Sequence, residues 1–412
     1  MSALARFYAH EGVTVSGSDR SETDLTKALA TEGMAVCYEQ TAANIKARPE
    51  LDLVVYTEAM PPDNPELLSA KEQGIRTVNY FTALGEVANQ YYLIAISGTH
   101  GKSTTTAMLI DIMEAADLDP TAIVGSLRAK DGRNFRPGKS RYFVVEACEY
   151  KRDFMTLEPD ILVITNVEYE HVDCYSDLAS VQTAFRDLAE RVPSTGAVVA
   201  PIKDASLAPI IKDLRATVVD YQSAFDPHLK QSLPGLHNHL NAAAATAVSE
   251  FLKIDKTVTK TALENFPGLW RRFEFKGEVN GVPLYDDYAH HPSEITATIS
   301  GTRDKYPRKK ITVVFQPHTY SRTKALLDDF ITSLTLADRV VLVPIYASRE
   351  VTETSVSSEQ IVAKLADKGV DALYADSLQA AADTIKKTVS DDDVIVIMGA
   401  GDVTELADLL TA

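Results

Sequence analysis

The chain has 412 residues, of which 45% are hydrophobic and 24% are charged, and its formal net charge is −17. The length suits two or three domains of ~150 residues each, and the composition is that of a globular protein rather than a disordered one. The acidic balance argues against a nucleic-acid partner, because phosphates require a basic face. No apolar run approaches the roughly 20 residues of a membrane span, and the first residues lack the layout of a signal peptide. We therefore expect a cytoplasmic protein with no membrane partner.

The chain contains three cysteines, Cys37, Cys148 and Cys174, and no Cys-x-x-Cys pair. An odd and sparse set suits reduced thiols rather than a disulfide framework or a zinc site.

Helix and strand patterns alternate over residues 1–90. Helices are expected at 2–10 and 25–32, and strands at 13–16 and 51–56. Such βα alternation predicts a parallel sheet. A nucleotide-binding domain of this kind normally opens with a strand and a glycine-rich turn, whereas this segment opens in a helix. Either its start is misassigned, or the domain is incomplete, or its ligand site is degraded.

A second segment, residues 91–268, begins with a phosphate-loop pattern. An apolar run at 93–96 predicts a buried strand, and a turn with two glycines then leads into a helix. Backbone N–H groups and the helix dipole at such a turn favour phosphate, while the lysine reaches the terminal phosphates and the next hydroxyl can hold Mg²⁺. The common pattern has a glycine where this chain has Ile96, so the alternative is a plain strand-turn-helix with a solvated lysine. The loop residues are Gly98, Thr99, His100, Gly101, Lys102, Ser103 and Thr104.

Polar residues follow two further strands of this segment. The strand predicted at 141–145 ends in Glu146, which is either a Mg²⁺ carboxylate beside Ser103 or a solvated strand-end residue. The strand predicted at 161–165 leads to His171, which lies among acidic residues. This group could hold a second cation, orient a substrate carboxylate, or form an acidic surface turn. Its acidic members are Glu168, Glu170 and Asp173. An alanine-rich helix is expected at 238–252.

The third segment, residues 269–412, follows the strong breaker Pro267-Gly268. Strands are expected at 311–315, 340–344 and 394–398, with helices between them. The last strand runs into Gly399 and Gly401, which suit a simple tight turn about as well as a ligand contact. We therefore predict an α/β protein of three domains, each built on a mostly parallel sheet with flanking helices.

Several cationic and imidazole side chains gather at the strand ends of the third segment. Each could be structural, but together they could face an anionic ligand if the domains close. They are Arg271, Arg272, His290, His291, His318 and Arg322, and Asp286, Asp287 and Tyr288 precede the histidine pair.

The motifs together resemble one family, the Mur ligases. SGTHGKSTTTAM, VVEACEYKRDF, ITNVEYEHVD, GLHNHLNAAAA, RRFEF, DDYAHHPSE, FQPHTYSRT and MGAGDV occur in this order and cover essentially the whole chain. The resemblance implies domains that bind UDP-substrate (1–90), ATP (91–268) and amino acid (269–412), with ATP and Mg²⁺ required. It is strongest to members that join L-alanine to the lactyl carboxylate of UDP-N-acetylmuramate through an acyl phosphate, in peptidoglycan synthesis. It separates these less well from ligases that recycle a tripeptide onto the same acceptor.

The resemblance also implies roles for individual residues. The loop from Gly98 to Thr104 would bind ATP phosphates, with Lys102 as the phosphate lysine, and Asp286 would meet the nucleotide. Ser103, Glu146 and His171 match metal positions. His237 and Asn238 match an adenine-side motif, with Asn241 nearby, and the substrate side would comprise Arg272, Tyr288, His290, His318 and Arg322.

The chain departs from the family pattern at three places. Thr319 replaces an arginine that often follows the histidine of the QPH motif, and Cys148 replaces an aspartate common in the metal-site motif. The family opens with a strand and a glycine-rich loop, of which Met1-Ser2-Ala3 matches only the end. This motivates a different hypothesis, a non-catalytic nucleotide-binding regulator, although the retained Lys102, Ser103, Glu146 and His171 argue against it. We expect a monomer or a homodimer.

Overall fold

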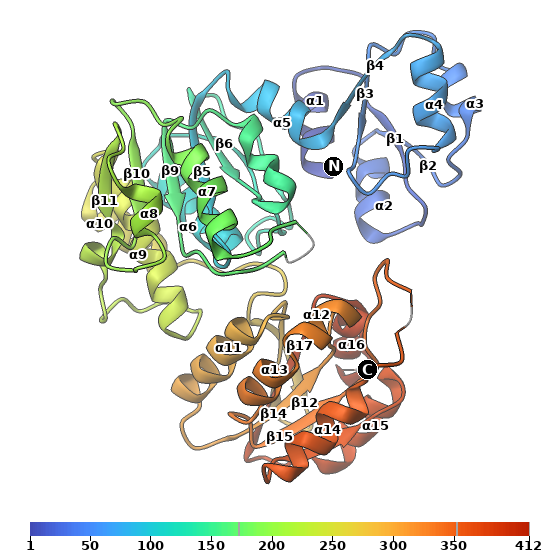
Figure 1. Ribbon diagram of the computed structural model, residues 1–412, viewed down its shortest axis with the longest axis vertical. Helices are drawn as coiled ribbons and strands as arrows, with labels where there is room; N and C mark the ends of the chain where they lie inside the picture. Colours follow the sequence, from blue (N-terminus) through green and yellow to red (C-terminus); the bar gives the residue numbers. More distant parts are fainter. Residues whose placement is uncertain (172–173, 352, 412) are drawn as a thin grey trace. The chain divides into compact units, whose positions relative to one another are not determined.

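The computed structural model describes residues 1–171, 174–351 and 353–411 (Figure 1). Asp173, which the sequence analysis grouped with His171, lies outside these residues. Contacts divide the chain into two compact units, Met1–Phe225 with Ala242–Leu263, and Asp226–Asn241 with Glu264–Ala412.

The first part of the first unit contains two separate pairs of parallel strands, β1 with β2 and β3 with β4. The strand predicted at 13–16 starts only at Ser16, because Val13 closes the preceding helix: its N–H donates to the carbonyl of Tyr8 at 3.0 Å, and Gly12 has φ +81°. The elements are α1 (Ser2–His10), β1 (Ser16–Ser18), α2 (Asp24–Thr31), β2 (Ala35–Cys37), α3 (Ala42–Lys46), β3 (Leu53–Tyr56), α4 (Pro65–Glu72), β4 (Arg76–Asn79) and α5 (Tyr80–Ala88).

The rest of the first unit is built on a seven-stranded sheet of order β11-β10-β9-β5-β8-β6-β7, parallel except for the short β7. Its central strands are apolar runs buried on both faces, as expected when helices cover a parallel sheet. The strands are β5 (Tyr92–Ser97), β6 (Thr121–Ile123), β7 (Phe135–Arg136), β8 (Tyr142–Glu146), β9 (Ile161–Ile164), β10 (Ala197–Ala200) and β11 (Thr217–Asp220). The helical elements are α6 (Lys102–Ala115), η1 (Tyr150–Thr156), α7 (Leu178–Ala189), α8 (Ala208–Ile211), η2 (Tyr221–Ala224) and α10 (Lys256–Glu264). Helix α9 (Leu236–Phe251) is divided between the units: it belongs to the second unit as far as Asn241 and to the first from Ala242.

Strand register positions the candidate site of this unit. β5 pairs in parallel with β8 on one side and β9 on the other, so that Ile96 lies opposite Glu146 and Ser97 opposite Ile164. The carboxyl ends of three strands therefore meet at one edge of the sheet, which is where α/β sheets bind their ligands.

The second unit has a six-stranded sheet of order β12-β13-β17-β14-β15-β16. An antiparallel hairpin, β12 with β13, forms one edge, and the other pairs are parallel. The strands are β12 (Glu274–Val279), β13 (Val282–Asp287), β14 (Lys310–Phe315), β15 (Arg339–Leu342), β16 (Asp371–Tyr374) and β17 (Asp393–Met398). The helices are α11 (Pro292–Lys305), α12 (Tyr320–Ala325), α13 (Leu327–Leu334), α14 (Ser358–Asp367), α15 (Leu378–Thr388), η3 (Asp402–Glu405) and α16 (Leu406–Thr411).

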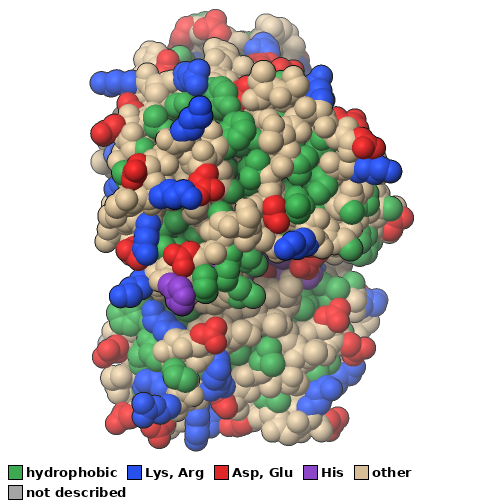
Figure 2. Space-filling view, turned by 90° about the vertical axis from the view of Figure 1, so that its left-hand side faces the viewer, with side chains coloured by type: hydrophobic (Ala, Val, Ile, Leu, Met, Phe, Trp, Pro, Cys, Tyr) green, Lys and Arg blue, Asp and Glu red, His purple; other side chains and the backbone are tan. Residues whose placement is uncertain are grey.

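The surface carries charges of both signs. On the face shown in Figure 2, Lys and Arg side chains are interspersed with Asp and Glu side chains. Within the described ranges, no helix combines the length and the apolar character needed to cross a bilayer.

Candidate functional site

The glycine-rich turn between β5 and α6 requires its glycines. Gly98 has φ +125° and Gly101 has φ +82°, conformations that other residues adopt only with strain. A Cβ atom on Gly98 would lie 2.1 Å from Thr165 Oγ1 and 2.9 Å from the Thr165 amide nitrogen. The turn is therefore packed directly against the residues that follow β9.

Side chains and backbone after β9 hold this turn in place. Thr99 N–H donates to the carbonyl of Asn166 at 3.0 Å, and His100 N–H donates to Asn166 Oδ1 at 2.9 Å. The Thr165 hydroxyl donates to the His100 carbonyl at 2.5 Å, and Glu168 N–H donates to Thr99 Oγ1 at 2.9 Å. Thr165 and Asn166 were assigned no role from the sequence alone, although their place at the end of a strand was a signal for one.

Lys102 lies at the first position of α6 with its side chain only 14% exposed. Its ammonium donates to the carbonyls of Gly98 at 2.6 Å and Thr99 at 3.0 Å, and to Glu149 Oε1 at 3.1 Å. Burial lowers the pKa of the ammonium, but Glu149, Cys148 and Glu146 together outweigh burial and raise it. The lysine is therefore a fixed cation inside the loop.

Ser103 and Glu146 are also brought together. The Ser103 hydroxyl donates to Glu146 Oε2 at 2.8 Å, and the Gly125 N–H donates to the same oxygen at 2.9 Å. A hydroxyl and a carboxylate are oxygen ligands of the kind that Mg²⁺ prefers. The residues therefore suit the cation that the sequence analysis placed here.

His171 lies beside a second glutamate, Glu149. Its Nε2 is 3.4 Å from Glu149 Oε1, and its ring packs edge-on against Tyr150 at 5.0 Å between centroids. The ligand atoms of Glu149, Glu170 and His171 all lie within 4.8 Å of one another, so Glu170 joins His171 as expected from the sequence. Burial opposes ionisation of Glu149, but Lys102 and His171 together lower the pKa of its carboxyl.

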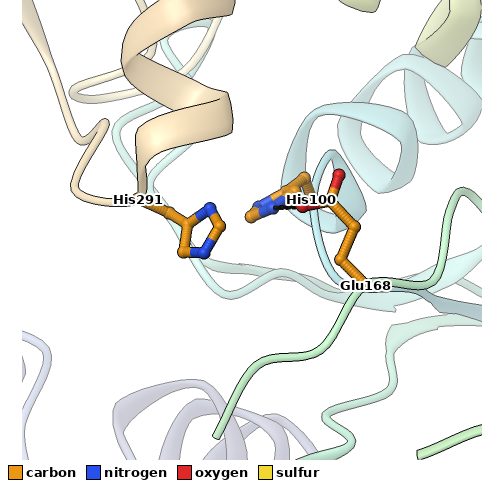
Figure 3. Close-up of side chains that lie close together, drawn as sticks. All are labelled: His100, Glu168 and His291. Carbon is orange, nitrogen blue, oxygen red and sulfur yellow. Dashed lines mark ion pairs between the residues drawn. The ribbon is translucent and has the colours of Figure 1, made fainter. Parts of the chain in front are cut away.

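Glu168 contacts a different histidine from the one expected. Its carboxylate lies 3.5 Å from His100 Nε2, and Figure 3 shows these two side chains beside one another. Glu149 was assigned no role from the sequence, although it follows Glu146 by three residues in the same motif.

In the second unit, Asp286 is completely buried and binds Arg271, which is 2% exposed. Arg271 Nε lies 3.1 Å from Asp286 Oδ2, and the Thr404 hydroxyl donates to the same oxygen at 2.6 Å. Arg271 also donates to the carbonyls of Gly399 and, at 3.1 Å, Gly401. Burial raises the pKa of Asp286 despite the neighbouring guanidinium. This pair ties β13 to the turn after β17.

Arg272, Tyr288 and His290 lie close together next to this pair. The Arg272 guanidinium is 5.2 Å from the centre of the Tyr288 ring, a distance suited to a cation–π contact. The rings of Tyr288 and His290 are 5.3 Å apart, and His290 Nδ1 lies 3.2 Å from Glu294 Oε2. His291 occupies another position: it is the N-cap of α11.

His318 and Arg322 form a second group in the same unit. Arg322 Nη1 donates to the His318 carbonyl at 2.9 Å and lies 3.2 Å from His318 Nδ1. The His318 ring stacks on Tyr346 at 5.6 Å and lies 6.0 Å from the His290 ring. Burial, followed by His290 and Arg322, lowers the pKa of His318 to about 4. The structure thus joins the DDYAHH and QPH motifs around a neutral imidazole.

Two residues that support this group were not singled out from the sequence. Tyr346 forms the stacking surface for His318, and Glu350 accepts hydrogen bonds from the hydroxyl of Thr319 at 2.6 Å and the amide of Ser321 at 3.0 Å. Thr319, at the position of the family arginine, therefore anchors the segment that carries Arg322.

The adenine-side residues lie at the start of α9. Asn238 Nδ2 donates to the carbonyl of Pro234 at 2.8 Å and lies 3.0 Å from His237 Nε2. Asn241 Nδ2 donates to Asn238 Oδ1 at 3.3 Å, and both asparagines are buried. These contacts order the segment that precedes the helix.

A glycine-rich turn at the end of a central parallel strand, with a buried lysine and a hydroxyl–carboxylate pair, defines a nucleoside-triphosphate-binding protein of the phosphate-loop class. Three family models match the chain: "Mur ligase family, catalytic domain" at residues 1–92, "Mur ligase middle domain" at 96–225 and "Mur ligase, glutamate ligase domain" at 271–401. The chain belongs to the Mur ligase family, and the fold class predicted from the sequence is confirmed.

Alignments with related proteins cover nearly the whole chain. It is 40% identical to a UDP-N-acetylmuramate–L-alanine ligase of Agathobacter rectalis, with 99% of this chain and 94% of the relative covered. It is 38% identical, at the same coverage, to the enzyme of that name from Caldanaerobacter subterraneus. Among solved structures, a UDP-N-acetylmuramate–alanine ligase of Thermotoga maritima is similar with a TM-score of 0.82 and 27% identity, covering 100% of this chain and 95% of that one.

A murein peptide ligase of Psychrobacter arcticus is also similar, with a TM-score of 0.71, 24% identity and coverage of 100% of this chain and 95% of that one. At this identity the likeness supports the fold alone.

Proposed function

We propose that this protein is an ATP-dependent ligase that joins L-alanine to the lactyl carboxylate of UDP-N-acetylmuramate in peptidoglycan precursor synthesis. The observation that carries the proposal is the joint placement of Lys102, Ser103 and Glu146 around the phosphate loop. It occurs in a chain 40% identical, over 99% of its length, to a ligase of that name.

The reaction follows from the chemistry of a carboxylate, which is a poor acyl donor. A lactyl carboxylate oxygen attacks the γ-phosphorus of ATP, and the bond between this phosphorus and the oxygen that bridges to the β-phosphate breaks. ADP departs, and the acceptor becomes an acyl phosphate. The amino group of L-alanine then attacks the acyl carbon, inorganic phosphate departs, and the amine loses a proton. Positioning and electrostatic stabilisation dominate such transfers.

The first unit supplies the groups for phosphate. The amides of residues 98–104 and the Lys102 ammonium bind the ATP phosphates. Ser103 and Glu146 would hold Mg²⁺, and His171, whose Nε2 lies 3.4 Å from Glu149, would serve a second metal ion and the substrate. Bound Mg²⁺ offsets charge on the phosphate oxygens. The oxygen-rich donor set at Glu146 supports this assignment.

The second unit supplies the groups for the amino acid and the acceptor. Arg322 and Arg272 are cations for carboxylate and phosphate groups, and the neutral His318 can exchange a hydrogen bond with an incoming amine. Tyr288 and His290 complete this proposed surface. His237 and Asn238 are assigned to the adenine. Asp286 acts indirectly, because its carboxylate is buried against Arg271.

We also propose three functional domains, at residues 1–90, 91–268 and 269–412, and a cytoplasmic location as monomer or homodimer. The starts of the family-model matches, at residues 1, 96 and 271, support the division, although the middle-domain match ends at residue 225. ATP and a UDP-linked acceptor are cytoplasmic compounds, which supports the location.

The test is phosphate release by the purified protein with ATP, Mg²⁺ and UDP-N-acetylmuramate, with L-alanine, glycine, L-serine or the tripeptide in parallel. We expect release that needs both L-alanine and the acceptor. Release with tripeptide alone would instead assign the recycling reaction. Nucleotide binding without release under any condition would favour the non-catalytic regulator.

A further inference from the structure

Glu149 is the most deeply buried of the described carboxylates that contact the phosphate loop, and the proposed reaction assigns it no role. Its side chain is 3% exposed. Its own backbone is fixed, because the Tyr175 hydroxyl donates to its carbonyl at 2.5 Å and the Arg152 amide donates to the same oxygen at 2.9 Å. A buried carboxylate costs free energy unless it is paired, so its partners indicate its role.

We infer that Glu149 is a positioning residue for the ligase reaction, which holds the Lys102 ammonium and the His171 imidazole in one arrangement around the γ-phosphate. The inference rests on the proposed function. Both partners reach one oxygen: Lys102 Nζ lies 3.1 Å from Oε1, and His171 Nε2 lies 3.4 Å from the same atom. The second oxygen, Oε2, is 3.0 Å from Lys102 Nζ.

The hydrogen bonds of Lys102 show how Glu149 fixes the position of its ammonium group. An ammonium has three N–H donors, and here they meet the Gly98 carbonyl, the Thr99 carbonyl and Glu149. The two carbonyls belong to the loop itself. Glu149 is thus the contact that ties the lysine to a separate element, the segment after β8.

Glu146 and Glu149 follow the same strand but serve different partners. Glu146 contacts Ser103 and Gly125, the proposed metal side of the loop. Glu149 contacts Lys102 and His171, which come from α6 and from the segment after β9. One motif, E-A-C-E, therefore fixes the hydroxyl and the lysine through two separate carboxylates.

This arrangement predicts how binding and turnover should respond to loss of the charge. A carboxylate beside the loop repels the ATP phosphates, so it does not favour the ground-state complex. Its benefit lies in orienting Lys102 and His171 as charge shifts in the transition state. A small misplacement of such groups costs about 10²-fold in rate. Loss of Glu149 should therefore lower kcat and leave the KM for ATP unchanged or reduced.

The experiment compares wild type, Glu149→Gln, Glu149→Asp and the exposed control Glu158→Gln, by kcat, KM for ATP, ADP binding by calorimetry and thermal unfolding. We expect kcat to fall about 10²-fold in Glu149→Gln, with ADP affinity and the KM for ATP at least as favourable as wild type. The kcat of Glu149→Asp should lie between those of wild type and Glu149→Gln, because the shorter side chain keeps the negative charge but moves it away from Lys102 and His171. Glu158→Gln should match wild type.

Wild-type kcat in Glu149→Gln would overturn the inference, and so would a raised KM with unchanged kcat. If Glu149→Gln fails to fold, Glu149→Asp decides: reduced kcat supports the inference and wild-type kcat overturns it. An inactive wild type is a distinct result, which removes the proposed function and this inference with it.

Discussion

The amide of Gly125 and the carboxylate of Glu146 are joined at 2.9 Å, and there is no room between them for a side chain. A Cβ atom on Gly125 would lie 2.6 Å from Glu146 Oε2, the oxygen that also accepts from Ser103. The glycine after β6 therefore sets the position of the proposed metal carboxylate.

Gly125→Ala should displace Glu146 and sharply raise the Mg²⁺ concentration needed for half-maximal phosphate release. The cause is steric, because Gly125 does not have a positive φ. The control is Gly369→Ala, where φ is +81° and no atom lies within 4 Å of the new Cβ. It should lose stability but keep the wild-type Mg²⁺ titration. An unchanged titration in Gly125→Ala would place the metal elsewhere.

Lys102→Ala should abolish ATP turnover while the circular dichroism spectrum stays native. It should also lower the unfolding temperature, because Glu149 keeps its burial and loses its counter-ion. Lys102→Arg is the matched variant: it keeps the charge, so stability should recover further than activity. Wild-type phosphate release by a folded Lys102→Ala protein would remove the assignment of the loop.

The sequence was sufficient to predict elements that depend on hydrophobic periodicity and local motifs. It was not sufficient to predict contacts between residues far apart in the chain. The strands around the phosphate loop were predicted because apolar runs and glycine turns are local signals. The β12–β13 hairpin was missed although Asn280-Gly281 is a strong turn signal and both residues have positive φ. Glu149 and Tyr346 were missed because their partners, Lys102 and His318, are 47 and 28 residues away in the chain, and no local pattern records such contacts.

Protonation of His318 should make the stability of the protein depend on pH. Its pKa is lowered to about 4 in the folded state from an ordinary 6.5, so between these values the unfolded chain binds more protons than the native one. Stability from this group is therefore fully present above about pH 6.5 and is lost as pH falls towards 4. Asp287 has the opposite effect on the pH dependence of stability: burial raises its pKa to about 6, so its contribution to stability falls as pH rises.

The measurement is the urea midpoint of wild type and of His318→Gln from pH 4 to 8, since the difference between the two curves cancels Asp287. We expect the difference to favour wild type least at pH 4 and to level off above about pH 6.5. A difference independent of pH would mean that His318 is not a neutral, buried imidazole.

The adjacent residues Arg271 and Arg272 should separate stability from activity. Arg271 is buried against the fully buried Asp286, so Arg271→Ala leaves a carboxylate without its cation and should cost about 3–5 kcal/mol of unfolding free energy. Arg272 is less buried and packs on Tyr288, so Arg272→Ala should cost less than about 1 kcal/mol of stability while raising the KM for substrate.

Urea unfolding and steady-state kinetics on both variants test this contrast. The double variant Arg271→Met, Asp286→Leu removes both charges and should recover much of the stability lost in Arg271→Ala, because a buried pair is costly mainly when one partner is missing. Thr404 would then lose its acceptor, since its hydroxyl donates to Asp286 at 2.6 Å, so recovery should stay incomplete. Equal destabilisation by Arg271→Ala and Arg272→Ala would contradict the structural role assigned to the Arg271–Asp286 pair.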